Sequence, residues 1–455
     1  MNEIRSYIEL NNDKNLLNWC ERNLTIDNPE YMNKLRMKLW LGNTPQKLNL
    51  FEVIGDKIRL PYGLLYKIYP VINGKIKDYT KCRFPIKINE NIELYDYQEK
   101  AVNSINKRCG IIQAPAGSGK TQIGIALIKK IGYKALWLTH TKDLLNQSKK
   151  RYQAYFGKSG VGTITEGKVN IGTKVTFATV QTMAKLDLPK YENEFDLIIV
   201  DECHNVVGTP TKVQRFYKVL NSLNARYKYG LTATLHRSDG MVKATKAILG
   251  DVAVVVDAET VKGKILDVGI KKIDTGIKDS QDYLKYDGTI DWNKLIAYIC
   301  NNDLRNQKII NVLKNSESKS SLILSDRVQH LVDLRNMLPD DLKKKSCILS
   351  SKSKKDERAK AILDMQNGGK LFMFATYSLA KEGLDIPRLE RLYLTTPKSD
   401  YAVVVQAIGR IARTFDNKAN PIAYDFVDDI GLLKRKYKDR WKHYKKINCY
   451  EVKDG

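Results

Sequence analysis

The sequence is poor in cysteine pairs and in long apolar segments, and both absences exclude classes of protein. Its seven cysteines are scattered over 455 residues without a C-x-x-C pair, so no disulfide framework or zinc site is indicated. No run of about 18 apolar residues exists, which excludes a membrane-spanning helix. The amino-terminal stretch also lacks the apolar core of a signal peptide. These absences predict a protein of the reducing cytoplasm, with neither a membrane nor a metal cluster as partner.

Negative charge is scarce as well. The chain has 51 Asp and Glu against 77 Lys and Arg, which leaves a formal net charge of +26 and a pI near 9.5. Such an excess indicates a polyanionic partner, either nucleic acid or an anionic membrane surface. Because the other features favour the cytoplasm, we expect nucleic acid. The length predicts two or three domains.

A glycine-bearing turn between a strand and a helix is the most informative segment. Residues 109–112 predict a buried parallel strand, and residues 122–130 predict a helix. Glycines let the backbone N–H groups of such a turn point at a polyphosphate, and the helix N-terminus adds positive potential. The strict phosphate-loop pattern G-x-x-x-x-G-K-[ST] has glycine where this chain has Ala114. A plain glycine turn before a helix is the alternative. The residues expected to hold the phosphates are Ala116, Gly117, Ser118, Gly119, Lys120 and Thr121, with the Thr121 hydroxyl also a ligand of Mg²⁺.

Two carboxylates follow a second buried strand, expected at residues 197–200. Asp201 and Glu202 would lie at the carboxyl edge of the sheet, where ligands bind in open α/β folds. We expect Asp201 to hold Mg²⁺ and Glu202 to polarise the water that attacks the γ-phosphate. A solvated strand end is the alternative, but a phosphate-loop lysine upstream makes it the weaker one. This part of the chain is predicted to hydrolyse a nucleoside triphosphate.

Hydroxyl and amide side chains follow other expected strands of this first α/β unit. Thr141, Thr179 and Gln181 stand at strand ends and are candidates for contacts with nucleic-acid phosphates. Helix capping is an equal alternative for the two threonines. Gln98, ahead of the phosphate loop, carries an amide that suits the N6/N7 edge of adenine.

Five regions are expected along the chain. Residues 1–90 predict a small α+β accessory domain with a net charge of +5 that touches nucleic acid, or alternatively only supports the motor. Residues 91–255 and 291–430 predict two α/β lobes with parallel sheets, joined by a connection at 256–290. Residues 431–455 form a basic tail with a net charge of +6. Its aromatics Tyr437, Trp441 and Tyr444 suit nucleic-acid contact, with a solvated amphipathic helix as the alternative.

The second lobe has no phosphate loop, so we expect it to complete the site of the first. Gln406, Arg410 and Arg413 have the i, i+4, i+7 spacing of one helix face. Arginines on such a face are suited to stabilising a transferring phosphate. An exposed basic helix face is the alternative.

The order of these segments resembles that of the superfamily-2 helicases and translocases, over about residues 90–430. Residues 114–121 resemble their first motif, in which alanine at the opening position is normal. Residues 201–204 resemble the DExH box, and residues 232–234 resemble the motif that couples ATP hydrolysis to unwinding. The resemblance implies coupling roles for His204, Thr232 and Thr234 and adenine recognition by Gln98.

The later motifs of the same family are also matched. Thr376, Gly383 and Asp385 resemble motif V, and Gln406, Arg410 and Arg413 resemble motif VI. The resemblance assigns Thr376 to nucleic acid and Gly383 and Asp385 to the nucleotide. It implies a pair of tandem RecA-like lobes that use ATP and Mg²⁺. Residues 231–239 are similar to the segment with an R-E-D triplet in XPB-type helicases, with Ser238 at its middle position, and Arg237 is a candidate contact to nucleic acid.

Within the superfamily, the chain looks most like bacteriophage branch-migration helicases of the UvsW-like group. This resemblance implies a DNA helicase acting on branched recombination or replication intermediates, as a monomer in the cytoplasm of a host cell. An RNA helicase or transcript-release ATPase is the alternative from the same superfamily. A non-catalytic scaffold is disfavoured, since Lys120, Glu202 and Arg413 are all present. DNA in branched, duplex or single-stranded form is the expected partner, and RNA stays open.

Overall fold

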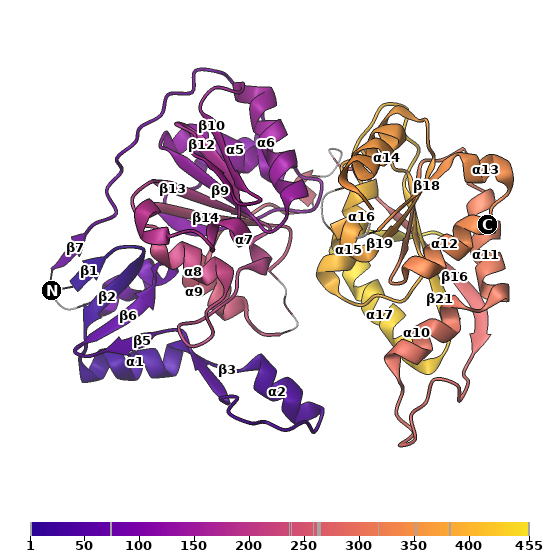
Figure 1. Ribbon diagram of the computed structural model, residues 1–455, viewed down its shortest axis with the longest axis horizontal. Coiled ribbons are helices and arrows are strands. Elements are labelled where there is room, and N and C mark those ends of the chain that lie inside the picture. Colours follow the sequence, from indigo (N-terminus) through magenta and orange to yellow (C-terminus); the bar gives the residue numbers. More distant parts are fainter. Residues whose placement is uncertain are drawn as a thin grey trace. The chain divides into compact units, whose positions relative to one another are not determined.

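The chain divides into two compact units, which the computed structural model describes at residues 2–72, 75–235, 237, 239–257, 259–261, 265–316, 318–350, 353–381 and 384–453 (Figure 1). The first unit comprises Met1–Ala114 and Gly119–Asp257, and the second comprises Pro115–Ser118 and Ala258–Gly455. Each contains a largely parallel sheet covered by helices, which confirms the predicted fold class. Within the described ranges, no helix has both the length and the apolar character needed to cross a membrane.

The amino-terminal part of the first unit is a five-stranded sheet in the order β5-β6-β2-β1-β7, with a separate two-stranded ribbon of β3 and β4. Only the β1–β7 pairing is parallel among the pairs of the five-stranded sheet. The elements are β1 (Asn2–Ile4), β2 (Tyr7–Asn11), α1 (Lys14–Leu24), β3 (Thr25–Asp27), α2 (Pro29–Arg36), β4 (Lys47–Asn49), β5 (Glu52–Ile54), β6 (Lys57–Pro61), η1 (Tyr62–Leu64), α3 (Leu65–Ile68), η2 (Tyr69–Val71) and β7 (Ile76–Asp78).

The rest of the first unit is built on an eight-stranded sheet in the order β11-β10-β12-β9-β13-β14-β8-β15, in which only β10–β11 is antiparallel. Its central strands are continuous apolar runs because helices cover both faces. The elements are α4 (Asp96–Asn103), β8 (Cys109–Gln113), α5 (Lys120–Ile131), β9 (Ala135–Thr139), α6 (Lys142–Phe156), β10 (Val161–Thr165), β11 (Lys168–Asn170), β12 (Val175–Thr179), α7 (Val180–Met183), η3 (Leu188–Tyr191), β13 (Leu197–Asp201), η4 (Cys203–Asn205), α8 (Arg215–Ser222), β14 (Tyr227–Thr232), α9 (Val242–Leu249) and β15 (Val252–Val255).

The amino-terminal sheet and this larger sheet share one apolar core. Ile8 and Leu60 of the small sheet belong to the same buried cluster as Met241, Ala244 and Ala247 around α9. The contact is so close that a Cβ added at Gly63 would lie 2.2 Å from the backbone nitrogen of Gly250. The helical turn η1 therefore packs directly against the end of α9.

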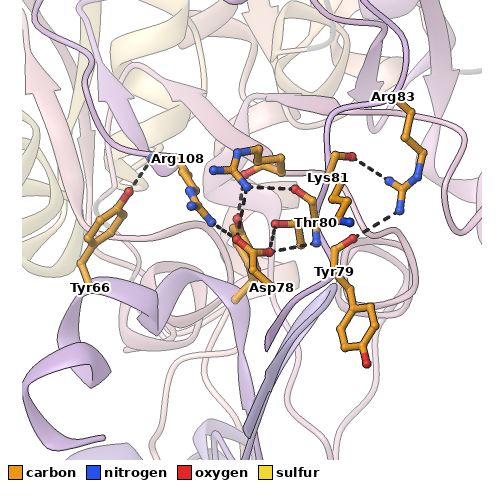
Figure 2. A network of polar contacts seen from close by, with 9 residues as sticks. Tyr66, Asp78, Tyr79, Thr80, Lys81, Arg83 and Arg108 are labelled. Atoms are coloured by element: carbon orange, nitrogen blue, oxygen red, sulfur yellow. Dashed lines mark hydrogen bonds and ion pairs between the residues drawn. The ribbon is translucent and has the colours of Figure 1, made fainter. Parts of the chain in front are cut away.

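Polar contacts reinforce this junction (Figure 2). Asp78 accepts hydrogen bonds from Thr80 and Arg108, and Arg226 reaches it at 3.2 Å. Burial opposes ionisation of Asp78, but the hydrogen bonds from Thr80 and Arg108 outweigh it, so its pKa lies below the ordinary value. Tyr66 accepts the Arg108 backbone N–H at 2.9 Å. The first 80 residues are thus held to the eight-stranded sheet by charge as well as by apolar contact.

A buried lysine lies at the same junction. Lys228 on β14 is fully buried and donates from Nζ to the carbonyl oxygens of Leu220 at 2.7 Å and Ser6 at 3.1 Å. Burial lowers the pKa of Lys228 to about 7, because the charged ammonium has lost its water. The amino-terminal turn at Ser6 therefore provides part of the environment of this ammonium group.

The second unit is built on a seven-stranded parallel sheet in the order β18-β19-β17-β20-β21-β16-β22. Strand β16 lies within the segment 256–290, expected as a connection, and its pairing with β21 makes it part of this sheet. The elements are η5 (Glu259–Val261), β16 (Gly269–Lys278), α10 (Trp292–Cys300), α11 (Asp303–Lys314), β17 (Ser321–Ser325), α12 (Val328–Asn336), α13 (Asp340–Lys344), β18 (Ser346–Leu349), α14 (Lys355–Asn367), β19 (Phe372–Thr376), α15 (Tyr377–Lys381), β20 (Arg391–Leu394), α16 (Tyr401–Ile411), β21 (Ile422–Asp429), α17 (Gly431–Lys446) and β22 (Tyr450–Glu451).

The segment expected as a basic tail is a helix packed on this sheet. In α17, Arg440 is 1 % exposed and binds both oxygens of Asp425 on β21 at 2.7 Å. Tyr444 is fully buried and donates to the same carboxylate at 2.8 Å. The expectation that Tyr444 contacts nucleic acid is therefore wrong, because its ring and its hydroxyl are used inside the lobe.

Candidate active site

The phosphate loop joins β8 to α5 through two glycines in the left-handed region. Gly117 has φ +86° and Gly119 has φ +78°, values that residues with a Cβ seldom adopt. Within the turn, the N–H and the hydroxyl of Ser118 both donate to the Pro115 carbonyl oxygen, at 3.2 and 2.7 Å. Lys120 opens α5 and Thr121 follows it, so both lie in the first turn of a 12-residue helix. This local geometry fits an anion at a helix N-terminus.

Gln98 lies beside the same helix terminus and is buried. Its Oε1 accepts the Tyr95 backbone N–H at 3.0 Å, and its Nε2 lies 3.4 Å from Gln122 Oε1. A Cβ at Gly119 would come within 2.4 Å of Gln98 Nε2. The amide that was expected to recognise adenine therefore also caps the start of α4, and glycine at 119 leaves space for it.

The carboxylate pair is at the end of β13. Asp201, 5 % exposed, accepts the Ser148 hydroxyl at 3.2 Å and the Glu202 N–H at 3.0 Å. Burial and then the negative charge of Glu202 raise the pKa of Asp201, and the charge of Lys120 opposes this only in part. A divalent cation would offset the same repulsion, so the residues present fit the expected Mg²⁺.

A chain of polar contacts leads from this pair to β14. His204 Nδ1 lies 3.2 Å from Glu202 Oε2 and 3.3 Å from Thr232 Oγ1. The Thr232 hydroxyl donates to the Thr234 carbonyl at 2.7 Å and accepts the Thr234 N–H at 3.2 Å. The three residues expected to couple hydrolysis to movement are thus brought together in one buried chain.

Arg237 extends this chain. Its guanidinium binds the carboxylate of Asp239 through two nitrogens, at 2.9 and 2.6 Å, and also donates to the His204 carbonyl. The positions between and beside them, His236 and Ser238, lie outside the described residues. Arg237 is thus held against the DExH-like segment. To contact nucleic acid as expected, its guanidinium must release Asp239 or the His204 carbonyl, or bind a phosphate in addition to them.

Three of the candidates for nucleic-acid contact, Thr141, Thr179 and Gln181, lie at the carboxyl edge of the larger sheet. Thr141 caps α6 by accepting the Leu144 N–H at 3.3 Å, as the capping alternative expects. Thr179 donates to the Thr182 hydroxyl at 3.0 Å. A pocket of about 460 Å³ opens at this edge, with a lining formed by His140, Val180, Gln181, Asn205, Val213, Gln214, Arg215 and Phe216.

Sequence reasoning missed two residues that connect this pocket to the carboxylate pair. Asn205 Nδ2 donates to the Glu202 carbonyl at 3.2 Å and lies 3.4 Å from His140 Nδ1. Gln181 Nε2 donates to the His140 carbonyl at 2.6 Å. The only signal in the sequence for these two residues is their position. Asn205 directly follows the Asp-Glu-Cys-His segment, and His140 directly precedes Thr141.

In the second unit, two motif VI arginines contact the motif V segment, which comprises α15 and the residues after it. Arg410 on α16 donates from Nε to Ala380 O at 3.0 Å and from a terminal nitrogen to Leu384 O at 3.1 Å. Arg413 forms an ion pair with Asp385. Gly383, expected to bind nucleotide, lies outside the described residues.

The expectation that three motif VI residues share one helix face is wrong for Arg413. Helix α16 ends at Ile411, and Arg413 instead forms an isolated antiparallel bridge with Ile265. Gln406 is 6 % exposed, and no described residue donates a hydrogen bond to its Oε1. Thr376, at the end of β19, lies 3.0 Å from the Ser378 hydroxyl.

Comparisons with known proteins agree with this arrangement. Residues 91–237 match the family described as type III restriction enzyme, res subunit, and residues 304–415 match the helicase conserved C-terminal domain. The chain is 26% identical to putative helicase 161L of Invertebrate iridescent virus 6, over 94% of this chain and 97% of that protein. It is 23% identical to the ATP-dependent DNA helicase uvsW of Enterobacteria phage T4, over 87% of this chain and 84% of that protein.

Solved structures of the same architecture are also similar. Dbp5 of S. cerevisiae, bound to RNA and ADP BeF3, aligns over 86% of this chain and 94% of that chain, with a TM-score of 0.58 and 18% identity. This likeness supports the fold. The two family matches occur in the order found in a helicase motor, with the motifs inside them. The two family matches and the helicase relatives support a superfamily-2 helicase that works as a nucleic-acid-dependent ATPase.

Proposed function

We propose that this helicase remodels branched DNA, such as a replication fork or a four-way junction, at the expense of ATP. The observation that carries this proposal is the junction between the amino-terminal sheet and α9, because it packs a segment with a net charge of +5 (residues 1–90) against the sheet that carries the phosphate loop. Similarity to the phage DNA helicase uvsW supports it, since that alignment covers more of the chain than the two family matches do.

The proposed chemistry uses the residues at the two strand ends. Lys120 and the N–H groups of residues 116–119 bind the nucleotide phosphates, and the Thr121 hydroxyl and Asp201 hold Mg²⁺. A bound Mg²⁺ neutralises charge on the phosphates. Glu202 orients and polarises the attacking water, and His204 positions that carboxylate from one side.

We assign the second-unit arginines to the charge that develops on the transferred phosphate. Arg410 is already oriented by the carbonyl oxygens of Ala380 on α15 and of Leu384 after it. Arg413 exchanges Asp385 for phosphate, which a partly exposed ion pair allows at low cost. Gln406 is proposed to contact the nucleotide or the attacking water.

Nucleic acid is proposed to bind at the strand-end edge of the first unit. Thr141, Thr179 and Gln181 contact phosphates there, with Thr376 as their counterpart in the second unit. Because Gln181 bonds to His140 and His140 approaches Asn205, binding at this edge can shift the backbone of Glu202. This gives the stimulation of ATP hydrolysis a physical route.

The test compares ATP hydrolysis with single strands, duplexes and four-way junctions, each made in DNA and in RNA. The proposal expects the greatest stimulation by junction DNA and conversion of the junction into separate duplexes. Glu202→Gln is the control, since it keeps the shape of the side chain but removes the carboxylate. Preferential unwinding of RNA, or junctions left intact while single strands stimulate fully, would refute the branched-DNA function.

A further inference from the structure

The amino-terminal sheet carries a projecting segment with a surface that the proposed chemistry does not use. This α2 arm comprises residues 25–49, in which β3 and β4 pair as a ribbon and α2 lies between them. Leu48 and Ile26 pack the ribbon against the apolar core, but no residue of α2 is buried. Figure 1 shows β3 and α2 set apart from the five-stranded sheet.

The arm displays an unusual density of exposed apolar side chains. Single exposed apolar residues are ordinary, whereas a contiguous group marks an interaction surface. Trp40 is 89 % exposed, although tryptophan is usually largely buried. The exposed set comprises Met32, Leu35, Met37, Leu39 and Trp40.

These side chains are presented by an ordered turn. The Leu39 N–H donates to the Lys34 carbonyl at 2.9 Å, and Lys34 Nζ donates to the Thr44 hydroxyl at 2.6 Å. Gly42 has φ +51°, and a Cβ there would lie 3.0 Å from the indole ring of Trp40. The ring therefore rests near the Gly42 backbone while most of its surface faces solvent.

The charge of the arm complements phosphate. Lys34, Arg36 and Lys38 are its cations over residues 31–46, and this stretch contains no Asp or Glu. Glu30, at the start of α2, is already paired with Lys34 at 3.2 Å and with Lys212 at 2.9 Å. An acidic protein surface or a nucleic acid would satisfy these cations, and the established substrate class of the chain is nucleic acid.

The position of the arm favours nucleic acid further. Lys212, which pairs with Glu30, immediately precedes Val213, Gln214 and Arg215, and these three residues line the pocket at the carboxyl edge of the sheet. The arm is thereby attached to the edge that carries Gln181. We therefore expect a strand bound at that edge to pass near the arm.

We propose that the α2 arm binds nucleic acid at a single-strand–duplex junction, with Trp40 stacked on an unpaired base and Arg36 and Lys38 on phosphates. Aromatic stacking is tolerant of sequence, which suits an enzyme that must act on any sequence. The inference rests on the proposed function only in requiring a substrate with unpaired bases beside a duplex. It holds for a DNA or an RNA substrate.

The first experiment measures equilibrium binding to a forked substrate, to the same fork with abasic sites at its unpaired positions, and to a blunt duplex. Trp40→Ala and Trp40→Leu should weaken binding to the fork by about five-fold or more, and Trp40→Phe should retain most of it. Trp40→Ala and Trp40→Leu should bind the blunt duplex as well as the parent does. Abasic sites should weaken fork binding by the parent protein. They should not weaken it further for Trp40→Ala, because that variant has no indole ring to stack on a base.

Equal binding of the fork by Trp40→Leu and Trp40→Phe would overturn the proposal, since leucine keeps apolar area but not the aromatic face. Concentration-dependent self-association that Trp40→Ala abolishes, with fork binding unchanged, would also overturn it in favour of a protein partner. Because Trp40 is exposed, its replacement should not destabilise the fold. Thermal unfolding of the three variants is therefore the control, and we expect it to match that of the parent.

The second experiment addresses the cations. Arg36→Ser with Lys38→Ser should reduce the slope of log affinity against log salt by about one to two on the fork. Lys308→Ser with Lys314→Ser, on α11 of the second unit, removes the same charge from two exposed positions as a control. An unchanged slope in the arm variant would refute the phosphate contacts. Junction remodelling by the parent protein is recorded in parallel, so failure of the arm and failure of the branched-DNA function give different results.

Discussion

Arg413 and Asp385 form an ion pair that joins the segment after α16 to the loop after α15, with side chains 23% and 31% exposed. Solvent-exposed ion pairs contribute about 1 kcal/mol or less, and this pair is partly exposed. The guanidinium can therefore leave the carboxylate for a phosphate without a large penalty. The pair is best understood as a resting position for a proposed arginine finger.

Arg413→Ala should lower the turnover of ATP by on the order of 10³-fold while changing ATP affinity less. Arg413→Lys should not restore turnover, because an ammonium lacks the planar fork of a guanidinium. Asp385→Asn removes the ion pair but keeps the guanidinium, so it should lower turnover less than Arg413→Ala does. Steady-state hydrolysis with saturating nucleic acid provides the measurement, and near-normal turnover in Arg413→Ala would contradict the assignment.

Asn205→Ala should separate basal hydrolysis from its stimulation. The amide bridges the Glu202 carbonyl and the His140 ring, so its loss should leave basal turnover within a few-fold and reduce the stimulation by nucleic acid at least about ten-fold, equivalent to about 1.4 kcal/mol of coupling. Asn23→Ala, on the exposed face of α1, makes the same chemical change away from the site. Equal loss of basal and stimulated activity would mean that Asn205 supports the catalytic geometry itself.

Lys228 should make the stability of the first unit depend on pH. Its pKa is about 7 in the folded chain against an ordinary value of 10.5, so the unfolded chain binds the extra proton between these values. Stability therefore rises with pH in this window, by up to about 1.4 kcal/mol per pH unit, and the burial penalty is fully present below pH 7. Lys228→Met removes this pH dependence. Its free energy of unfolding should be closest to that of the parent at high pH, where the lysine is neutral.

The measurement is the free energy of unfolding by denaturant of the parent and of Lys228→Met from about pH 6 to about pH 9. The carbonyls of Ser6 and Leu220 lose their donor in the variant at every pH, so that cost cancels in the slope. A difference between the two proteins that does not change with pH would show that Lys228 stays charged in the folded state.

Helix α17 should be required for folding of the second unit. Arg440→Met leaves the buried carboxylate of Asp425 without its cation and should cost about 3–5 kcal/mol. Replacing all three polar partners, as Asp425→Leu, Arg440→Met and Tyr444→Phe together, should recover part of that loss. Thermal unfolding checks both variants, and an unchanged melting temperature in Arg440→Met would show that α17 is dispensable.

The sequence was sufficient for elements whose signals are local. The strand before the phosphate loop, the strand before Asp201 and the second α/β lobe were all predictable from apolar runs and motif spacing. The burial of Tyr444 is not predictable in this way, because a helix with aromatic and basic residues has the same local pattern whether these residues face solvent or a buried aspartate on another strand. The partnership of Asp385 with Arg413, and the packing of η1 on α9, join residues far apart in the chain, and no local pattern encodes such pairings.

The last prediction concerns how the amino-terminal sheet acts on the substrate. Deleting residues 1–90 cannot test this cleanly, because the deletion would expose Met241, Ala244 and Ala247 of the shared core and leave Arg108 without Asp78. Such a deletion should lower the stability of the whole first unit and with it every activity. Removing surface charge avoids this problem, since Lys14 and Arg22 on α1 are exposed and do not support the core.

Lys14→Ser with Arg22→Ser should weaken binding of a four-way junction, and the salt slope should fall by about 0.9 for each phosphate that is no longer neutralised. Hydrolysis stimulated by single strands should stay unchanged, because single strands are proposed to bind at the strand-end edge and not at α1. The double change Lys308→Ser with Lys314→Ser again removes equal charge from the other unit. If the α1 variant bound single strands and junctions equally less well, the amino-terminal sheet would act through general attraction, whereas a defect confined to the junction would identify it as the part that holds a second duplex arm.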